Sequence, residues 1–304
     1  MEDKELQGIK ETLQEVSTQI QNVSNDAQSA AIELAHSEVE QPEISPEEQA
    51  RQDRVVACVR KIVLLNTIMG NNPVYGVLPS EHLKILSAQE KVFLEERNEA
   101  LAAIHSKYLI EVLDGLADMF VVQTGYQHLN APIPEELIAE GRFPEQFAGH
   151  VGSALMGPEI GALSNSVFAG MADAFHIARI ASEQLFIDKL GVSQERYLEG
   201  CIRALELICD NNLAKATKDK DVAARWYKKL GKKLVEKEGW HIRAVEVNGE
   251  TWYSLFDGNG KFRKHKDFVG VDLQPVLDYM LEGIDKELIP DQDNAKLLFE
   301  QARG

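Results

Sequence analysis

Apolar residues recur at steps of three and four over long stretches of this chain, which is the spacing of amphipathic helices. The first long stretch starts at Pro46 and carries an apolar face over residues 55–65. It stops at Gly70-Asn71-Asn72-Pro73, because glycine and proline both end helices. The periodicity therefore predicts a mainly α-helical fold that begins with a long helix ending near Gly70.

Two further helices are predicted before residue 130. One starts near Ser87, whose hydroxyl can cap the helix together with Glu90 three residues later. The other runs from Lys107 to Thr124, and Gly125 is expected to close it. The connection around residues 104–107 is short, which favours antiparallel packing of the two helices.

The second half of the chain combines helices with one switch to strand periodicity. Residues 130–158 are rich in Pro and Gly and indicate an insertion or lid. Alternation of period two over His241–Val247 and Glu250–Phe256, separated by Asn248-Gly249, predicts a β-hairpin with a primed turn. Helical patterns cover residues 163–189, 193–218 and 226–239, and a last helix is expected from Pro275 to about Leu288.

The first fifty residues differ in composition from the rest of the chain. Residues 1–50 contain twelve Asp and Glu residues and only Lys4 and Lys10 as basic residues. A short apolar repeat from Leu6 to Ile20 indicates one amphipathic helix followed by a linker. We expect three parts: an acidic, partly helical or disordered arm (1–50), a helical catalytic domain (51–240), and a β-hairpin and C-terminal helix extension (241–304).

The charge balance limits the possible partners. With 32 Lys and Arg against 49 Asp and Glu, the formal net charge is -17, which disfavours nucleic-acid polymers and anionic membranes. No stretch approaches the roughly 20 apolar residues of a membrane span. The three cysteines, Cys58, Cys201 and Cys209, have no zinc-ligand spacing, so we expect buried thiols in a cytoplasmic protein.

Two sets of carboxylates stand at helical spacing in consecutive helices. Glu96 and Glu99 are three residues apart, so they share one face of the second helix. Glu111, Asp114 and Asp118 share one face of the third helix and are flanked by apolar residues. If the helices pair antiparallel, these hard oxygen ligands can bind Mg²⁺, or alternatively Mn²⁺.

These acidic segments resemble the all-α nucleoside triphosphate pyrophosphohydrolases, the family that includes MazG and the dimeric dUTPases and dCTPases. The sequence is most similar to phage MazG-like members. Residues 95–99, EERNE, match the family's EExxE motif, and residues 111–114, EVLD, match its ExxD motif. Residues 115–118, GLAD, also align with this region but have glycine in place of the glutamate. Either Glu111 or Asp114 can therefore replace that glutamate beside Asp118.

The resemblance extends over most of residues 55–278 and implies further site residues. The segment Asn212-Leu213-Ala214-Lys215 resembles the family's NxxK signature, which implies that Asn212 and Lys215 contact the nucleotide. The segment from Asp257 to Leu273 resembles the C-terminal extension of phage-type members. Asn66, a polar residue in an apolar helix, is a candidate base contact, with helix capping as the alternative.

We therefore expect Mg²⁺-dependent hydrolysis of (deoxy)nucleoside triphosphates to monophosphate and pyrophosphate. Glu95 or Glu96 would act as the general base. The protein would form a homodimer or homotetramer. It would be located in the cytoplasm, which is the host cytoplasm if the chain is phage-encoded. One alternative is a non-catalytic helical assembly protein that binds a partner through its acidic arm. Another is a metal phosphohydrolase acting on guanosine tetraphosphate or a phosphoribosyl nucleotide.

Overall fold

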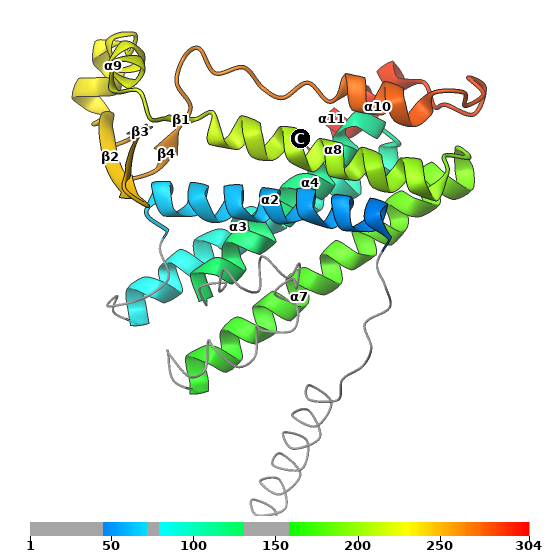
Figure 1. The fold of residues 1–304 in the computed structure, drawn as a ribbon, viewed down its shortest axis with the longest axis horizontal. Helices are drawn as coiled ribbons and strands as arrows, with labels where there is room; N and C mark the ends of the chain where they lie inside the picture. The colour runs from blue at the N-terminus through cyan, green and yellow to red at the C-terminus, as the bar shows by residue number, and fades with distance from the viewer. Residues whose placement is uncertain (1–44, 72–78, 131–157, 304) are drawn as a thin grey trace, which may run out of the picture. The chain divides into compact units, whose positions relative to one another are not determined.

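A computed structural model of the chain describes residues 45–71, 79–130 and 158–303 (Figure 1). The predicted acidic arm and the predicted insertion lie almost entirely outside these ranges. The chain divides into two compact units, Met1–Gln49 and Ala50–Gly304, and the site described below belongs to the second. The structure is mainly helical with a small antiparallel sheet near the C-terminus, which confirms the predicted fold class.

The long helices of the second unit carry most of its core. They are α2 (Pro46–Met69), α3 (Pro79–Ser106), α4 (Leu109–Asn130), α7 (Pro158–Glu183) and α8 (Gln194–Leu213). A π-helical turn, η2 (Gln184–Lys189), extends α7. Buried apolar side chains of α3, α4, α7 and α8 form one continuous cluster. Within the described ranges, the structure contains no helix whose length and hydropathy match a membrane span.

The most extensive helix contact among the described residues is the antiparallel pairing of α3 with α4. A two-residue connection joins them, with Lys107 in the left-handed region at φ 61°. The Tyr108 amide donates to the Ala103 carbonyl at 3.0 Å, and the Lys107 amide donates to the Ile104 carbonyl at 3.3 Å. This is the Schellman ending of a helix, and it reverses the chain within one turn. The expected antiparallel hairpin is therefore present.

Gly115 allows α3 and α4 to approach closely. A Cβ atom at Gly115 would lie 2.8 Å from Ala100 Cβ and 2.9 Å from Ala100 Cα. A side chain at residue 115 would therefore push against the backbone of α3. A larger residue at this point would separate the two helices.

Two of the predicted boundaries of α3 and α4 are wrong. Helix α3 begins at Pro79, so Ser87 lies inside the helix instead of capping it; proline is well suited to a first helical turn, because its missing N–H needs no partner there. Helix α4 continues through Gly125 to Asn130. A Cβ atom at Gly125 would lie 2.9 Å from Asn66 Nδ2, so this glycine permits close contact with α2 and does not end the helix.

The β-hairpin has the predicted bounds. Strands β2 (His241–Val247) and β3 (Glu250–Phe256) pair antiparallel with Val247 opposite Glu250. Asn248 and Gly249 both have positive φ, at 52° and 78°, as the primed turn requires. The sheet is larger than predicted, because β1 (Ala216–Thr217) and β4 (Phe262–Arg263) also pair with β3. The predicted helix over residues 193–218 therefore ends earlier, at Leu213.

Short helices flank the sheet and close the chain. Helix α9 (Lys220–Lys228), capped by Asp219, and the π-helical turn η3 (Lys233–Lys237) occupy most of the predicted segment 226–239. Helix α10 (Gln274–Leu281) is shorter than predicted, and Gly283 follows with φ 80°. Sequence reasoning missed α11 (Gln292–Arg303), which packs on α3 through buried Ala295 and Phe299.

Ion pairs and the contact between the Cys58 and Cys209 side chains join α2 to α8. Arg54 contacts Glu199 at 2.7 Å and Glu206 at 2.6 Å. Cys58 and Cys209 are buried, Cys201 is half-buried, and all three are free thiols, as expected. This pairing fixes the helix that carries Asn212 and precedes Lys215.

We predict that Gly115→Ala destabilises the protein by about 1–3 kcal/mol, because the added methyl group overpacks the contact with Ala100. Gly170→Ala in α7 is the matched control, since no atom lies within 4 Å of a Cβ built there. The control should be neutral or stabilising by up to about 1 kcal/mol, because alanine favours helix over glycine. Urea unfolding measures both, and equal midpoints for the two variants would contradict the proposed close contact.

Candidate metal centre

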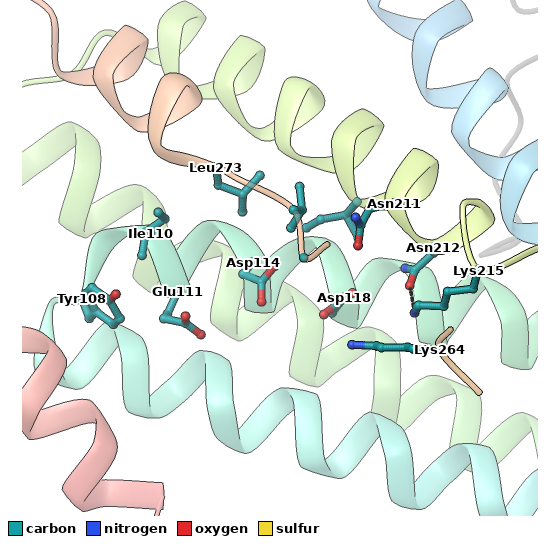
Figure 2. Close-up of a pocket in the computed structure, with 13 residues that line it drawn as sticks. Tyr108, Ile110, Glu111, Asp114, Asp118, Asn211, Asn212, Lys215, Lys264 and Leu273 are labelled. Carbon is teal, nitrogen blue, oxygen red and sulfur yellow. Dashed lines mark hydrogen bonds between the residues drawn. The ribbon is translucent and has the colours of Figure 1, made fainter. Parts of the chain in front are cut away.

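A cavity of about 350 Å³ lies between α4, the end of α8 and the segment that follows β4 (Figure 2). Its polar lining combines carboxylates with lysines and amides. The lining residues are Tyr108, Ile110, Glu111, Asp114, Asp118, Ile208, Asn211, Asn212, Lys215, Lys264, Gly270, Val271 and Leu273. Three of the predicted metal ligands and both residues of the NxxK segment therefore share one cavity.

Helix α4 supplies the acidic side of the cavity. Figure 2 shows Glu111, Asp114 and Asp118 in a row along α4. Their steps of three and four residues place them on one helix face, while Val112, Leu113 and Met119 are buried in the core. The apolar face of α4 thus fixes the direction in which the carboxylates point.

Helix α3 adds a second set of carboxylates beside this row. Glu96 and Glu99 do not line the cavity, but both are half-buried. Glu96 is electrostatically coupled to Asp118 and Asp114, and Asp114 is coupled to Glu99. The close contact at Gly115 therefore places Glu96 and Glu99 within electrostatic reach of Asp114 and Asp118, although the carboxylates of α3 lie outside the cavity that those of α4 line.

Burial and mutual repulsion raise the pKa values of these carboxyl groups. Burial, followed by the charges of Asp118 and Glu99, raises the pKa of Glu96 to about 8. Burial, followed by the charge of Asp114, raises the pKa of Asp118 to about 7, although Lys215 partly opposes this. Burial also raises the pKa values of Glu111 and Asp114. Groups of carboxyls whose ionised forms are disfavoured in this way are typical of functional sites.

Cations of the chain only partly balance the acidic set. Arg303 at the end of α11 pairs with Glu99, and its charge also acts on Glu111 and Asp114. Glu96, Asp114 and Asp118 form no ion pair within the described part of the chain. Three partly buried carboxylates thus lack a direct counter-ion from the protein itself.

The carboxylates of this acidic set are chemically suited to bind a hard divalent cation. Carboxylate oxygens are the ligands that Mg²⁺ and Mn²⁺ prefer. Among residues 45–71, 79–130 and 158–303, however, no three acidic, histidine or cysteine side chains converge closely enough to hold an ion. Arg303 draws Glu99 to itself, and like charges repel one another. Metal binding at this site therefore requires side-chain rearrangement within the acidic set.

The end of α8 supplies the opposite side of the cavity. The Lys215 ammonium donates a hydrogen bond to Asn212 Oδ1, as the dashed line in Figure 2 shows. Burial, followed by the charge of Lys264, lowers the pKa of Lys215, while Asp118 and Glu96 act in the opposite direction. Asn212 and Lys215 are thus brought together with the α4 carboxylates, which lie about 100 residues earlier in the chain.

Lys264 is a cavity residue that sequence reasoning did not assign to the site. It follows β4, and its ammonium group points toward Asp118 in Figure 2. Its position depends on the folding of the β4 segment against α8, which no local pattern in the sequence reveals. The available signal was its place in the C-terminal segment that resembles the phage-type extension.

Two further predicted site residues, besides Glu96 and Glu99, lie outside the cavity lining. Glu95 is exposed on α3. Asn66 is only 4% exposed, donates a hydrogen bond to the Ile62 carbonyl at 2.9 Å, and packs against Gly125. Asn66 therefore contributes to the packing of α2 on α4, two helical turns beyond Asp118.

Comparisons of the chain with models of protein families, with curated proteins and with solved structures gave no match.

We predict that the metal-free protein loses stability as pH rises from about 5 to about 8. The pKa values of Glu96 and Asp118 are higher in the folded chain than in the unfolded chain, so the folded state binds more protons in this range. Stability is therefore greatest at the acidic end and falls as the carboxyls ionise. Urea unfolding in EDTA measures this dependence.

Glu96→Gln should flatten this pH dependence, because the amide does not ionise. Glu90→Gln on the same helix is the control, since Glu90 is not among the carboxylates coupled to Glu96. If the urea unfolding midpoint rises with pH, ionisation of these carboxyl groups does not destabilise the folded chain. The same conclusion follows if the midpoint changes equally with pH in the two variants.

Proposed function

We propose that this protein hydrolyses (deoxy)nucleoside triphosphates to monophosphate and pyrophosphate with the help of Mg²⁺. The observation that carries the proposal is the opposition of carboxylates and lysines in one cavity. Asp114 and Asp118 lie on α4, and Lys215 and Lys264 lie across from them. This arrangement suits a phosphate chain bridged to carboxylates by a divalent cation, because either ligand alone would meet repulsion from one side of the cavity.

Glu96, Glu99, Glu111, Asp114 and Asp118 are the residues that would hold the cation. When bound, Mg²⁺ polarises phosphoryl oxygens and neutralises the charge that develops on them. The chain's own residues supply the remaining functions.

Lys215 would bind the phosphate chain. Its ammonium group is half-buried, and its hydrogen bond to Asn212 fixes its direction. A charge-assisted hydrogen bond from such a lysine is roughly twice as strong as a neutral one. Asn212 would therefore act by orienting Lys215 as well as by contacting the nucleotide itself.

Glu96 is the better of the two candidate bases. It is half-buried beside Asp118, and burial and the neighbouring charges raise its pKa in the metal-free chain, which makes its carboxylate more basic than that of an exposed glutamate. Glu95 is exposed and belongs to the outer face of α3. In the proposed reaction the water oxygen bonds to the α-phosphorus, Glu96 takes the water proton, and the bond between the α-phosphorus and the bridging oxygen breaks to release pyrophosphate.

Assay of the purified protein on a panel of dNTPs and NTPs, with Mg²⁺ or with EDTA, tests this proposal. We expect nucleoside monophosphate and pyrophosphate with Mg²⁺ and no turnover in EDTA. Inorganic pyrophosphatase added after the reaction distinguishes pyrophosphate from orthophosphate. Orthophosphate as the sole product would overturn the proposed bond cleavage and favour another phosphohydrolase.

Glu99→Gln should lower turnover by more than about 100-fold, because it removes a charge that acts on the transition state through the cation. Thermal unfolding should remain cooperative, since Glu99 is half-buried at the helix surface and pairs only with Arg303 among the described residues. Glu90→Gln, on the same helix and outside the acidic set, should keep wild-type turnover. Full activity in Glu99→Gln would contradict the role of Glu99 in holding the cation. A folded wild-type protein that neither binds Mg²⁺ nor turns over any nucleotide would favour the alternative of a non-catalytic assembly protein.

A further inference from the structure

The segment between β4 and α10 crosses back over the end of α8, and we call these residues, 264–273, the strap. Figure 1 shows it running from the sheet to α10 along α8. Asn211 Nδ2 on α8 donates to the Val269 carbonyl at 2.8 Å. Buried Leu273 anchors the far end, next to α10. The strap is thus attached to the helix that carries Asn212.

The beginning of the strap is fixed to α9. The His265 ring stacks on the Trp226 indole, with centroids 4.0 Å apart and planes inclined by 6°. His265 Nε2 also lies 3.3 Å from the Ala214 carbonyl, and Lys229 pairs with Asp267 at 2.6 Å. These contacts after Lys264, and the pairing of β4 with β3 just before it, hold its backbone in place beside the cavity.

The strap brings Lys264 close to Lys215. Lys215 Nζ lies 5.5 Å from the centroid of the Phe268 ring, and Lys264 Nζ lies 5.0 Å from the same centroid. The charge of Lys264 disfavours the charged form of Lys215, and neither ammonium group forms an ion pair with a carboxylate of the described residues. Asp118 lies within electrostatic reach of both lysines and only partly offsets their repulsion, so an anionic ligand between the two cations would be favourable.

We propose that Lys215 and Lys264 together form a binding site for a polyphosphate chain, in which Lys264 is a second phosphate-binding residue supplied by the strap. The two ammonium groups come from separate elements and face the same cavity. Their combined charge matches a chain of two or three phosphoryl groups better than a single phosphate. The identity of the ligand as a nucleotide rests on the proposed function, whereas recognition of the phosphate chain does not.

Binding of inorganic tripolyphosphate and of orthophosphate in the presence of Mg²⁺, measured by calorimetry, tests this site without a base or sugar. Lys264→Ala should weaken tripolyphosphate binding by about 10- to 100-fold, which is the worth of one hydrogen bond to a charged group. Its effect on orthophosphate should be much smaller. Lys264→Arg should retain most of the affinity, because the charge remains.

Lys266→Ala is the matched control, since Lys266 belongs to the strap and is exposed but does not line the cavity. It should bind tripolyphosphate like the wild type. Equal affinities of Lys264→Ala and Lys266→Ala, or no binding of tripolyphosphate by the wild type, would overturn the proposed site.

The nucleotide panel separates this inference from the proposed function. Tripolyphosphate binding that depends on Lys264, without hydrolysis of any nucleotide, would support the site and contradict the enzyme. Pyrophosphate release with wild-type KM and kcat in Lys264→Ala would support the enzyme and contradict the role of Lys264.

Discussion

The close contact between Gly115 and Ala100 is the constraint on which the site depends. It lets α3 and α4 approach until the carboxylates of one helix act on those of the other. Apolar packing of α4 supplies the favourable free energy, and the assembled carboxylates oppose it, because burial and repulsion both disfavour their ionised forms. A fold that keeps such an arrangement gives up stability at this point, which is common at functional sites.

The positive groups around the acidic set differ in how firmly they are held. Lys215 is half-buried and hydrogen-bonded to Asn212, and the strap holds Lys264 in place. Arg303 is more exposed and lies at the end of the last helix, where it pairs with Glu99. Exposed ion pairs of this kind contribute only about 0–1 kcal/mol, so a divalent cation can readily displace Arg303 from Glu99. Lys215, in contrast, remains as a fixed charge for an anionic ligand, whereas the exposed Lys264 is held in place through its backbone.

Local patterns in the sequence predicted the fold class, the hairpin and the acidic faces. The bounds of β2 and β3 were predictable because Asn248 and Gly249 suit the left-handed conformations of a primed turn. The α3–α4 pairing followed from a short connection between two periodic segments. The helix start predicted at Ser87 and the helix end predicted at Gly125 were wrong, because residues that often start or end a helix are also tolerated inside one when tertiary packing favours it.

The parts that could not be predicted depend on contacts between distant segments. β1 is two residues long and exists because it pairs with β3. The positions of Arg303 and Lys264 depend on α11 packing on α3 and on the strap lying along α8. Asn66 was a candidate base contact because it is a polar residue in an apolar helix. Its close contact with Gly125 shows that Asn66 takes part in helix packing. Of the cations at the site, Lys215 was predicted from the sequence, whereas Lys264 and Arg303 became visible only in the folded chain.

Titration with Mn²⁺, with free ion measured by electron paramagnetic resonance, tests the central claim that α3 and α4 bind one divalent cation together. Asp118→Asn on α4 and Glu96→Gln on α3 should each weaken binding by at least about 10-fold, and the double variant should lose less than the two separate losses combined. That outcome would show that both helices contribute to one ion. Wild-type Mn²⁺ affinity in both single variants would contradict the account.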